Sequence, residues 1–413
     1  MISNYDDAVS WLFSRLPIFQ RQGAAAYKPG LERTLTLMHW LRHPYTRYPS
    51  IHVGGTNGKG SVSHLIAAVL QTKGLKTGLY TSPHLYDFRE RIKINGNKID
   101  QTFVLDFVKK FQKEMASSVD PSFFELTMAM AFEYFACNKI DVVVVEVGMG
   151  GRLDSTNVIT PIVSVITNIG WDHMQFLGDS LPKIALEKAG IIKPEVPVVI
   201  GERQPEVADV FEQVAAVKHA PLYYASDLYP ELDFECELKG DYQKKNTRTA
   251  YAVLQLLPID IKPTLEEIQL GFANVKKNTG LRGRWEMLSE RPLVIADTAH
   301  NFDGIKVVME QLRRERRGRL FVVWGMVQDK DPAKIFTLLP KDAYYIFTNP
   351  DVPRAMPLSD LEKNADTFEL SYESIPGVFQ AYTRALHLAT DSDTVYVGGS
   401  TFVVGDLLKE LDQ

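Results

Sequence analysis

The segment that decides the fold of this chain is Ile51-His52-Val53-Gly54-Gly55-Thr56-Asn57-Gly58-Lys59-Gly60-Ser61. It begins with an apolar run typical of a strand, continues through a glycine-rich turn with one lysine, and leads into a helical pattern. Because glycine lacks a Cβ, the backbone N–H groups of such a turn can surround anionic oxygens, while the helix N-terminus and Lys59 add positive potential. We therefore predict a phosphate-binding loop in a nucleotide-binding protein.

The spacing of this loop differs from the usual P-loop pattern, in which four residues separate the first glycine from Gly-Lys and Ser or Thr follows the lysine. Here Val53 occupies the first glycine position, and Gly60 stands between Lys59 and Ser61. The alternative is a glycine turn that only joins a strand to a helix and leaves Lys59 in solvent. The order of strand, turn and helix favours the nucleotide-binding interpretation.

Composition and charge indicate an ordinary globular protein. The chain has 413 residues, 45% of them hydrophobic and 23% charged, which is enough for more than one domain with a sizeable core. Its net charge of -5 lacks the basic field of a nucleic-acid binder. We interpret the one dense basic run, Arg313–Arg317, as a solvated helix end, where cations interact favourably with the helix dipole.

Cys137 and Cys236 are the only cysteines, and their spacing fits neither a disulfide framework nor a thiolate zinc site. We interpret both as core residues of a protein in the reducing cytoplasm. The sequence contains no N-terminal signal segment and no apolar run of about 18 residues, so we expect no membrane span.

Strand-like runs alternate with helical patterns in two series, which predicts an α/β protein with two domains. The run Asp141–Val147 is apolar on both faces, as is typical of a central parallel strand. We expect an N-terminal P-loop NTPase-like domain with a mostly parallel sheet, residues 1–283, and a smaller C-terminal Rossmann-like α/β domain, residues 284–413, divided within the polar stretch Lys276–Arg284. The expected strands are 50–53, 77–81, 141–147, 162–168, 196–200, 293–296, 320–324, 343–347 and 394–397, with helices at 62–73 and 123–138 and a hairpin turn at Asn95-Gly96.

Polar residues follow two of the expected buried strands, at the edge of a parallel sheet where ligands bind. Glu146 ends one strand, and its carboxylate either provides the oxygen ligand that Mg²⁺ prefers or marks the exit of the chain to solvent. Imidazole is an unusual magnesium ligand, so composition alone favours a structural histidine at His173. The pattern around Lys188 alone favours a solvated lysine on a helix.

Six motifs follow one another in order along nearly the whole chain: Gly55–Ser61, Thr81–Leu85, Glu146–Asn157, Asp172-His173 with Leu177-Gly178, Glu187–Ile191 and Asp297–Asn301. Together they resemble folylpolyglutamate synthase and dihydrofolate synthase of the Mur ligase superfamily. The resemblance implies an ATP-dependent ligase that joins L-glutamate to dihydropteroate and to reduced folates through an acyl phosphate, as in the bifunctional bacterial enzymes. Folylpolyglutamate synthase activity alone is the alternative.

The resemblance also implies the cofactors. Lys188 would carry a carbamate formed from CO₂, which replaces a cation that repels Mg²⁺ with an anion that attracts it. Glu146, His173 and the modified Lys188 would surround one Mg²⁺, and Ser82 with the nucleotide phosphates would complete another site. Whether K⁺ is also needed stays open.

The remaining residues carried over from the family fall into groups by their expected role. For the Phe123-Phe124 pair, the alternative to a contact with the pterin is packing in the hydrophobic core. Catalysis would involve Lys59, Lys188 and His300. ATP contacts would be Thr56, Asn57, Gly58, Lys59, Gly60, Ser61, Asn246, Arg284 and Asp297, pterin contacts Phe124, Arg152 and Asp154, and contacts with the incoming glutamate His300 and Ser400.

Three positions depart from the family pattern. Thr298 stands where glycine is usual, Phe302 where proline is common, and Tyr242 where histidine is usual. None of these changes removes a charged catalytic group. They therefore bear on details of the nucleotide and glutamate pockets rather than on the reaction class.

Three competing interpretations fit less well. A cell-wall Mur ligase would need a domain for its UDP-linked substrate, and only about 50 residues precede the loop. A simple kinase or GTPase would leave Lys188 without a role. A nucleotide-binding regulator without catalysis would not need a complete set of metal ligands. We expect a cytoplasmic monomer that acts on small molecules, without nucleic-acid or membrane partners, and whose C-terminal domain closes about a hinge at Gly280–Trp285.

Overall fold

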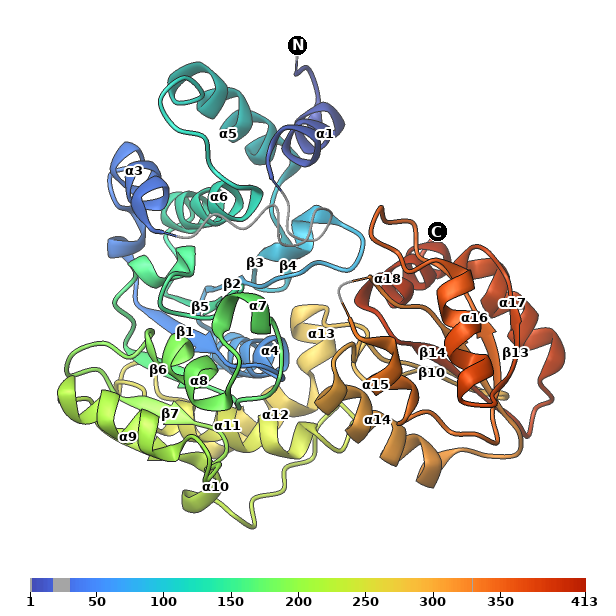
Figure 1. Ribbon diagram of the computed structural model, residues 1–413. Coiled ribbons are helices and arrows are strands. Elements are labelled where there is room, and N and C mark those ends of the chain that lie inside the picture. The colour runs from blue at the N-terminus through green and yellow to red at the C-terminus, as the bar shows by residue number, and fades with distance from the viewer. Residues whose placement is uncertain (1, 18–29, 329) are drawn as a thin grey trace. The chain divides into compact units, whose positions relative to one another are not determined.

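The computed structural model describes residues 2–17, 30–328 and 330–413. The chain divides into two compact units (Figure 1). The first comprises Met1–Glu237 and Gln243–Leu281, and the second comprises Leu238–Tyr242 and Arg282–Gln413. The five residues from Leu238 to Tyr242 thus belong to the second unit, although the residues on both sides of them belong to the first.

An eight-stranded sheet forms the centre of the first unit, in the order β4-β3-β2-β5-β1-β6-β7-β8. The edge strands β3 and β4 are antiparallel to their neighbours, and the other pairs are parallel. Because β1 lies between β5 and β6, the loops after these three strands leave the sheet at one edge. The strands are β1 (Ser50–Gly54), β2 (Thr77–Tyr80), β3 (Ile92–Ile94), β4 (Asn97–Lys98), β5 (Val142–Glu146), β6 (Val163–Ile166), β7 (Val198–Ile200) and β8 (Leu222–Tyr224).

Two groups of helices stand out in the first unit. The helix α4 begins directly after the glycine turn and packs against α11, α12 and α13. The helices α1, α3, α5 and α6 lie together in another part of the unit (Figure 1). The bounds are α1 (Tyr5–Arg15), α3 (Glu32–Trp40), α4 (Lys59–Thr72), α5 (Gln101–Glu114), α6 (Phe123–Cys137), α7 (Met174–Leu177), α8 (Leu181–Ala189), α9 (Ala208–Val217), α10 (Ala225–Leu228), α11 (Gln243–Gln255), α12 (Leu265–Ala273) and α13 (Val275–Thr279).

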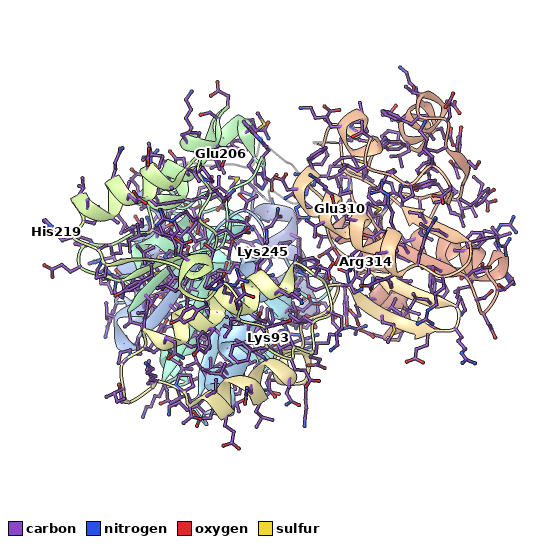
Figure 2. All side chains as sticks on the ribbon, turned by 90° about the horizontal axis from the view of Figure 1, so that it is seen from below. Lys93, Glu206, His219, Lys245, Glu310 and Arg314 are labelled. Carbon is purple, nitrogen blue, oxygen red and sulfur yellow. The ribbon has the colours of Figure 1, made fainter. Side chains whose placement is uncertain are left out.

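A six-stranded sheet forms the second unit, in the order β13-β12-β11-β14-β10-β9, and only β9 is antiparallel to its neighbour. The helix α14 ends within the basic run Arg313–Arg317, as predicted, and Arg314 pairs with Asp241 at 2.6 Å (Figure 2). The elements are β9 (Glu286–Glu290), β10 (Leu293–Ala296), β11 (Leu320–Trp324), β12 (Tyr344–Phe347), β13 (Ser371–Ser374), β14 (Thr394–Gly398), α14 (Phe302–Glu315), α15 (Pro332–Phe336), α16 (Leu358–Thr367), α17 (Val378–Leu388) and α18 (Thr401–Leu411).

The predicted α/β class, with a mostly parallel sheet in each unit, is confirmed. The hairpin expected at Asn95-Gly96 joins β3 to β4, and both turn residues have positive φ, as a type I′ turn requires. No helix in the described part of the chain is long and apolar enough to cross a membrane.

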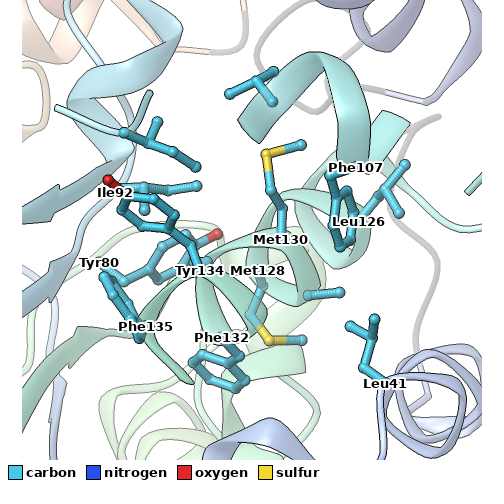
Figure 3. Close-up of a cluster of buried hydrophobic side chains, with 14 of the residues drawn as sticks. Leu41, Tyr80, Ile92, Phe107, Leu126, Met128, Met130, Phe132, Tyr134 and Phe135 are labelled. Atoms are coloured by element: carbon cyan, nitrogen blue, oxygen red, sulfur yellow. The ribbon is translucent and has the colours of Figure 1, made fainter. Parts of the chain in front are cut away.

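A core of aromatic and aliphatic side chains fixes α6 beside β2 and β3 (Figure 3). Each such side chain contributes roughly 1.5–3 kcal/mol when it is fully buried. This packing also fixes the first turn of α6, where Phe124 lies. The members labelled in the figure are Leu41, Tyr80, Ile92, Phe107, Leu126, Met128, Met130, Phe132, Tyr134 and Phe135.

The two cysteines differ in exposure. Cys236 is buried, as predicted, but Cys137 is exposed, so the prediction of a core position was wrong for this residue. The physical reason is its place at the last residue of α6, just beyond the buried Ala136.

Candidate functional site

The glycine turn after β1 is fastened to the end of β6. The N–H groups of Thr56 and Asn57 donate to the main-chain and side-chain oxygens of Asn168, at 2.9 and 3.0 Å. The Thr167 hydroxyl donates to the carbonyl of Asn57 at 2.6 Å. A Cβ on Gly55 would lie 1.9 Å from that hydroxyl oxygen, so only glycine fits there. Sequence reasoning did not single out Thr167, because a threonine at the end of an apolar strand carries no local signal.

The second half of the turn meets the start of α11. Gly58 has a φ of +86° and precedes α4, and a Cβ on it would lie 2.3 Å from Asn246 Oδ1. Asn246 donates to Gln243 Oε1 at 2.8 Å, and Gln243 donates to Ser61 Oγ at 3.3 Å. Gly60 lies in the first turn of α4. The structure therefore brings together the predicted nucleotide contacts of the first unit.

Two lysines converge on this turn. Lys59 Nζ donates to the carbonyls of Gly55 and Thr56 at 3.1 and 3.0 Å, and Lys188 Nζ donates to the carbonyl of Gly55 at 2.8 Å. Only 4% of Lys188 is exposed, so the solvated lysine favoured by its helical pattern is not what the structure contains. Burial, and then the charge of Lys59, lower the pKa of Lys188 to about 7. Its amine is therefore substantially neutral at neutral pH.

Glu146 ends β5, and Ser82 and His173 follow β2 and β6 on loops at the same edge of the sheet. Glu146 is buried, and its Oε2 accepts the N–H of Ser82 at 3.0 Å. His173 is partly exposed, with its Nε2 3.6 Å from Asp172 Oδ2. Within the residues that the structure describes, no three His, Cys, Asp or Glu side chains form a group suited to a metal ion. A metal held here would therefore need a further ligand.

The loop after β5 provides a surface for an aromatic ring. A Cβ on Gly148 would lie 2.5 Å from Cζ of Phe124 and 3.1 Å from Oδ2 of Asp154, so both side chains lie close to Gly148. Asp154 is buried, and burial raises its pKa. Arg152, by contrast, is 55% exposed and pairs with Glu187 at 2.9 Å. The structure thus places Phe124 and Asp154 around Gly148, whereas Arg152 pairs with a residue of α8.

In the second unit, two of the three departures from the family pattern contact predicted ATP residues. The buried Asp297 accepts the hydroxyl of Tyr242 at 2.6 Å, and burial raises the pKa of Asp297. Arg284 donates to the hydroxyl of Thr298. His300 Nδ1 lies 3.0 Å from the carbonyl of Thr298. Tyr242 and Thr298 therefore orient the side chains that we predicted to contact the nucleotide.

Ser400 caps the N-terminus of α18, where its hydroxyl accepts the N–H of Phe402 at 3.1 Å. It follows β14, which pairs in parallel with β10, and His300 follows β10. The two residues predicted to contact glutamate therefore follow neighbouring strands at one edge of the second sheet.

Comparisons with known proteins agree with this arrangement. Residues 53–227 match the Mur ligase middle domain, and residues 283–401 match the Mur ligase, glutamate ligase domain. A dihydrofolate synthase/folylpolyglutamate synthase of Bacillus subtilis (strain 168) is 32% identical over 440 residues and covers 100% of both chains. A folylpolyglutamate synthase of Lacticaseibacillus casei is 33% identical and covers 96% of this chain and 100% of the relative.

The fold of this chain is also similar to the folds of solved structures. E. coli FolC in complex with DHPP and ADP is 28% identical, with a TM-score of 0.87 over 99% of this chain and 98% of that chain. A bifunctional folylpolyglutamate synthase/dihydrofolate synthase with Mn, AMPPNP and L-glutamate bound is also 28% identical, with a TM-score of 0.84 over 100% and 98%. Fold and site define an ATP-dependent ligase of the Mur type. Within that class, the chain belongs to the dihydrofolate synthase/folylpolyglutamate synthase family.

Proposed function

We propose that the chain joins the amine of L-glutamate to the carboxylate of dihydropteroate, and to the γ-carboxylate of tetrahydrofolate and its polyglutamates. Ligands in the related structures support this choice, since one holds DHPP with ADP and another holds AMPPNP with L-glutamate. A carboxylate is a poor electrophile, so the acceptor carboxylate first attacks the γ-phosphorus of ATP, which releases ADP and gives an acyl phosphate. The glutamate amine then displaces phosphate through a tetrahedral intermediate.

The observation that carries the proposal is the convergence of Lys59 and Lys188 on the carbonyl of Gly55. Lys59 offsets the charge of the β- and γ-phosphates held in the turn. Lys188 has a different role, because its lowered pKa leaves a neutral amine that can add CO₂ to form a carbamate. This addition releases a proton and turns the neutral amine into a buried anion beside the phosphate loop.

That carbamate makes the site suitable for a divalent ion. Glu146 and His173 offer oxygen and nitrogen donors for one ion, and the modified Lys188 would add the ligand that the unmodified chain lacks. The hydroxyl of Ser82, together with the nucleotide phosphates, would hold another ion. A divalent ion held by these residues would offset charge on the triphosphate during transfer. The Mn in a related structure supports a divalent metal.

The other predicted residues keep their roles in the proposal. The boundary between the ATP-binding and glutamate-ligase domains is placed at 283/284, and the protein is proposed to be a cytoplasmic monomer. Nucleotide contacts come from Thr56–Ser61, Asn246, Arg284 and Asp297, pterin contacts from Phe124, Arg152 and Asp154, and glutamate contacts from His300 and Ser400.

The test is a glutamylation assay with the purified chain, Mg-ATP and L-glutamate, and with either dihydropteroate or tetrahydrofolate as acceptor. We expect ADP together with an acceptor whose mass has increased by one glutamyl unit, for both acceptors. Product with tetrahydrofolate alone would restrict the function to folylpolyglutamate synthesis, and ADP without product would refute the proposal. Omitting K⁺ tests the monovalent-cation requirement.

A matched pair of variants on α8 tests the role of Lys188. Lys188→Ala is expected to lower kcat/KM at least about 100-fold, because preorganised charge at a transfer site is worth several kcal/mol. Lys183→Ala, on the same helix but 64% exposed, should retain activity within about twofold. Mass spectrometry of the native protein should detect a CO₂ adduct that Lys188→Ala lacks. Full activity of Lys188→Ala would remove the basis of the mechanism.

A further inference from the structure

A buried chain of hydrogen bonds connects β1 with the loop after β5. His52 Nε2 lies 2.8 Å from Thr156 Oγ1, and that hydroxyl donates to Asp154 Oδ1 at 2.5 Å. Asp154 Oδ2 accepts the N–H of Met149 at 2.8 Å. His52 and Thr156 are fully buried and Asp154 is 7% exposed. The chain therefore crosses the interior of the first unit, where each polar group needs a partner.

The direction of each hydrogen bond follows from the groups themselves. A hydroxyl has one hydrogen, and that of Thr156 goes to Asp154, so Thr156 Oγ1 accepts from His52 Nε2–H. Burial lowers the pKa of His52 to about 3, so the ring is neutral and carries its only N–H on Nε2. Nδ1 of His52 has no hydrogen-bond partner within the described residues. The tautomer of His52 is thus determined by Thr156.

Asp154 connects these hydrogen bonds to the loop after β5. Its carboxylate accepts the N–H groups of Met149 and Thr156, which ties the start of the loop to its end. Gly148 lies close to both Asp154 and Phe124, since a Cβ there would overlap the ring of Phe124 at 2.5 Å and press on Asp154 Oδ2 at 3.1 Å. A shift of Asp154 would therefore move the surface on which Phe124 rests.

We propose that His52 and Thr156 are positioning residues for the flat heteroaromatic part of the acceptor, and that they act through Asp154 on the loop that carries Gly148. This inference rests on the proposed function, in which Phe124 and Asp154 lie on the pterin side of the site. Apolar side chains of the same shape would fill the space occupied by His52 and Thr156 equally well. The polar chain adds a defined orientation of the Asp154 carboxylate, which a substrate with N–H donors requires.

Thr156→Val, which is nearly isosteric but lacks the hydroxyl, tests the proposal. We expect it to raise KM for dihydropteroate, and Kd measured by fluorescence titration without ATP, about tenfold, because the Asp154 carboxylate loses the hydrogen bond that orients it toward the substrate. KM for ATP and for L-glutamate should stay within about twofold, because the phosphate turn is held by β6. Thr156→Ser keeps the hydroxyl and should restore the wild-type Kd.

Two further comparisons separate positioning from general destabilisation. Thr34→Val replaces another fully buried threonine, whose hydroxyl has no partner in the described chain, and should leave all three KM values unchanged. His52→Gln retains an N–H donor and should bind dihydropteroate better than His52→Leu. Unchanged dihydropteroate affinity in Thr156→Val, or an equal rise in all three KM values, would overturn the inference. Failure of the wild type to bind dihydropteroate would instead overturn the proposed function, and the inference with it.

Discussion

Lys93 offers a sharp test of how burial controls charge in this fold. The side chain lies on β3 in the first unit (Figure 2), is 4% exposed, and donates from Nζ to the carbonyl of Thr279 at 2.8 Å. Burial is the largest cause that lowers its pKa, from an ordinary 10.5 to about 8. We predict that Lys93→Met makes the first unit more stable at neutral pH and abolishes part of its pH dependence.

The magnitude follows from the shift in pKa. At about 1.4 kcal/mol per pKa unit, the charged form of Lys93 costs the folded state about 3 kcal/mol. Between pH 8 and 10.5 the unfolded chain binds more protons than the folded one, so the free energy of unfolding rises with pH in this window. Methionine removes that cost but loses the hydrogen bond to Thr279, worth about 1 kcal/mol. The variant should therefore be about 2 kcal/mol more stable near pH 7.5 and slightly less stable at pH 10.5.

Unfolding of the first unit alone can be followed by pulse labelling of the buried Cys236 in urea, in a Cys137→Ser background. Lys113→Met, at an exposed position on α5, is the matched control and should change stability by less than about 0.5 kcal/mol at every pH. Parallel curves of stability against pH for Lys93→Met and its parent would refute the reasoning, because they would mean that Lys93 binds protons equally in both states.

Two further predictions concern the nucleotide residues. Gly58→Ala should raise KM for ATP at least about tenfold, because the new Cβ would lie 2.3 Å from Asn246 Oδ1. The control Gly74→Ala also has a positive φ, +91°, but its Cβ would have nothing within 4 Å, so KM for ATP should stay unchanged. ATP-dependent glutamylation measures both variants. Tyr242→Phe removes a donor to the buried Asp297 and should lower the stability of the second unit by about 1–3 kcal/mol, measured by thermal unfolding; an unchanged Tm would contradict this role.

The centres of both sheets were predictable because burial there leaves a local signal. The run Val142–Val145 is fully buried, and an uninterrupted apolar run is what a parallel strand covered on both faces requires. The strands β10 and β11 begin and end at the predicted residues. The edge strand β13 was not predicted, because its partly exposed residues Ser371–Ser374 lack any apolar run.

Membership of Leu238–Tyr242 in the second unit could not be predicted from local sequence. The N–H of Asp241 donates to Gln311 Oε1 at 2.7 Å, and Gln311 Nε2 donates to the carbonyl of Lys239 at 3.1 Å. These partners are about 70 residues apart in the chain, and one polar glutamine on a long helix gives no hint of them. Only the folded arrangement identifies the segment.

The burial of Lys188 shows which features of the site local sequence patterns do not reveal. Its own helix has the pattern of a solvated lysine, but the loop after β5 packs against the end of that helix. A Cβ on Gly151 would lie 3.0 Å from Lys188 Cα, and a Cβ on Gly190 would lie 2.5 Å from Arg152 Cα. This reciprocal approach of two backbones needs glycine on both sides, and it contributes to the burial that, with the charge of Lys59, lowers the pKa of Lys188. The environment of the lysine is therefore encoded by glycines in two distant motifs, which helical periodicity around Lys188 cannot reveal.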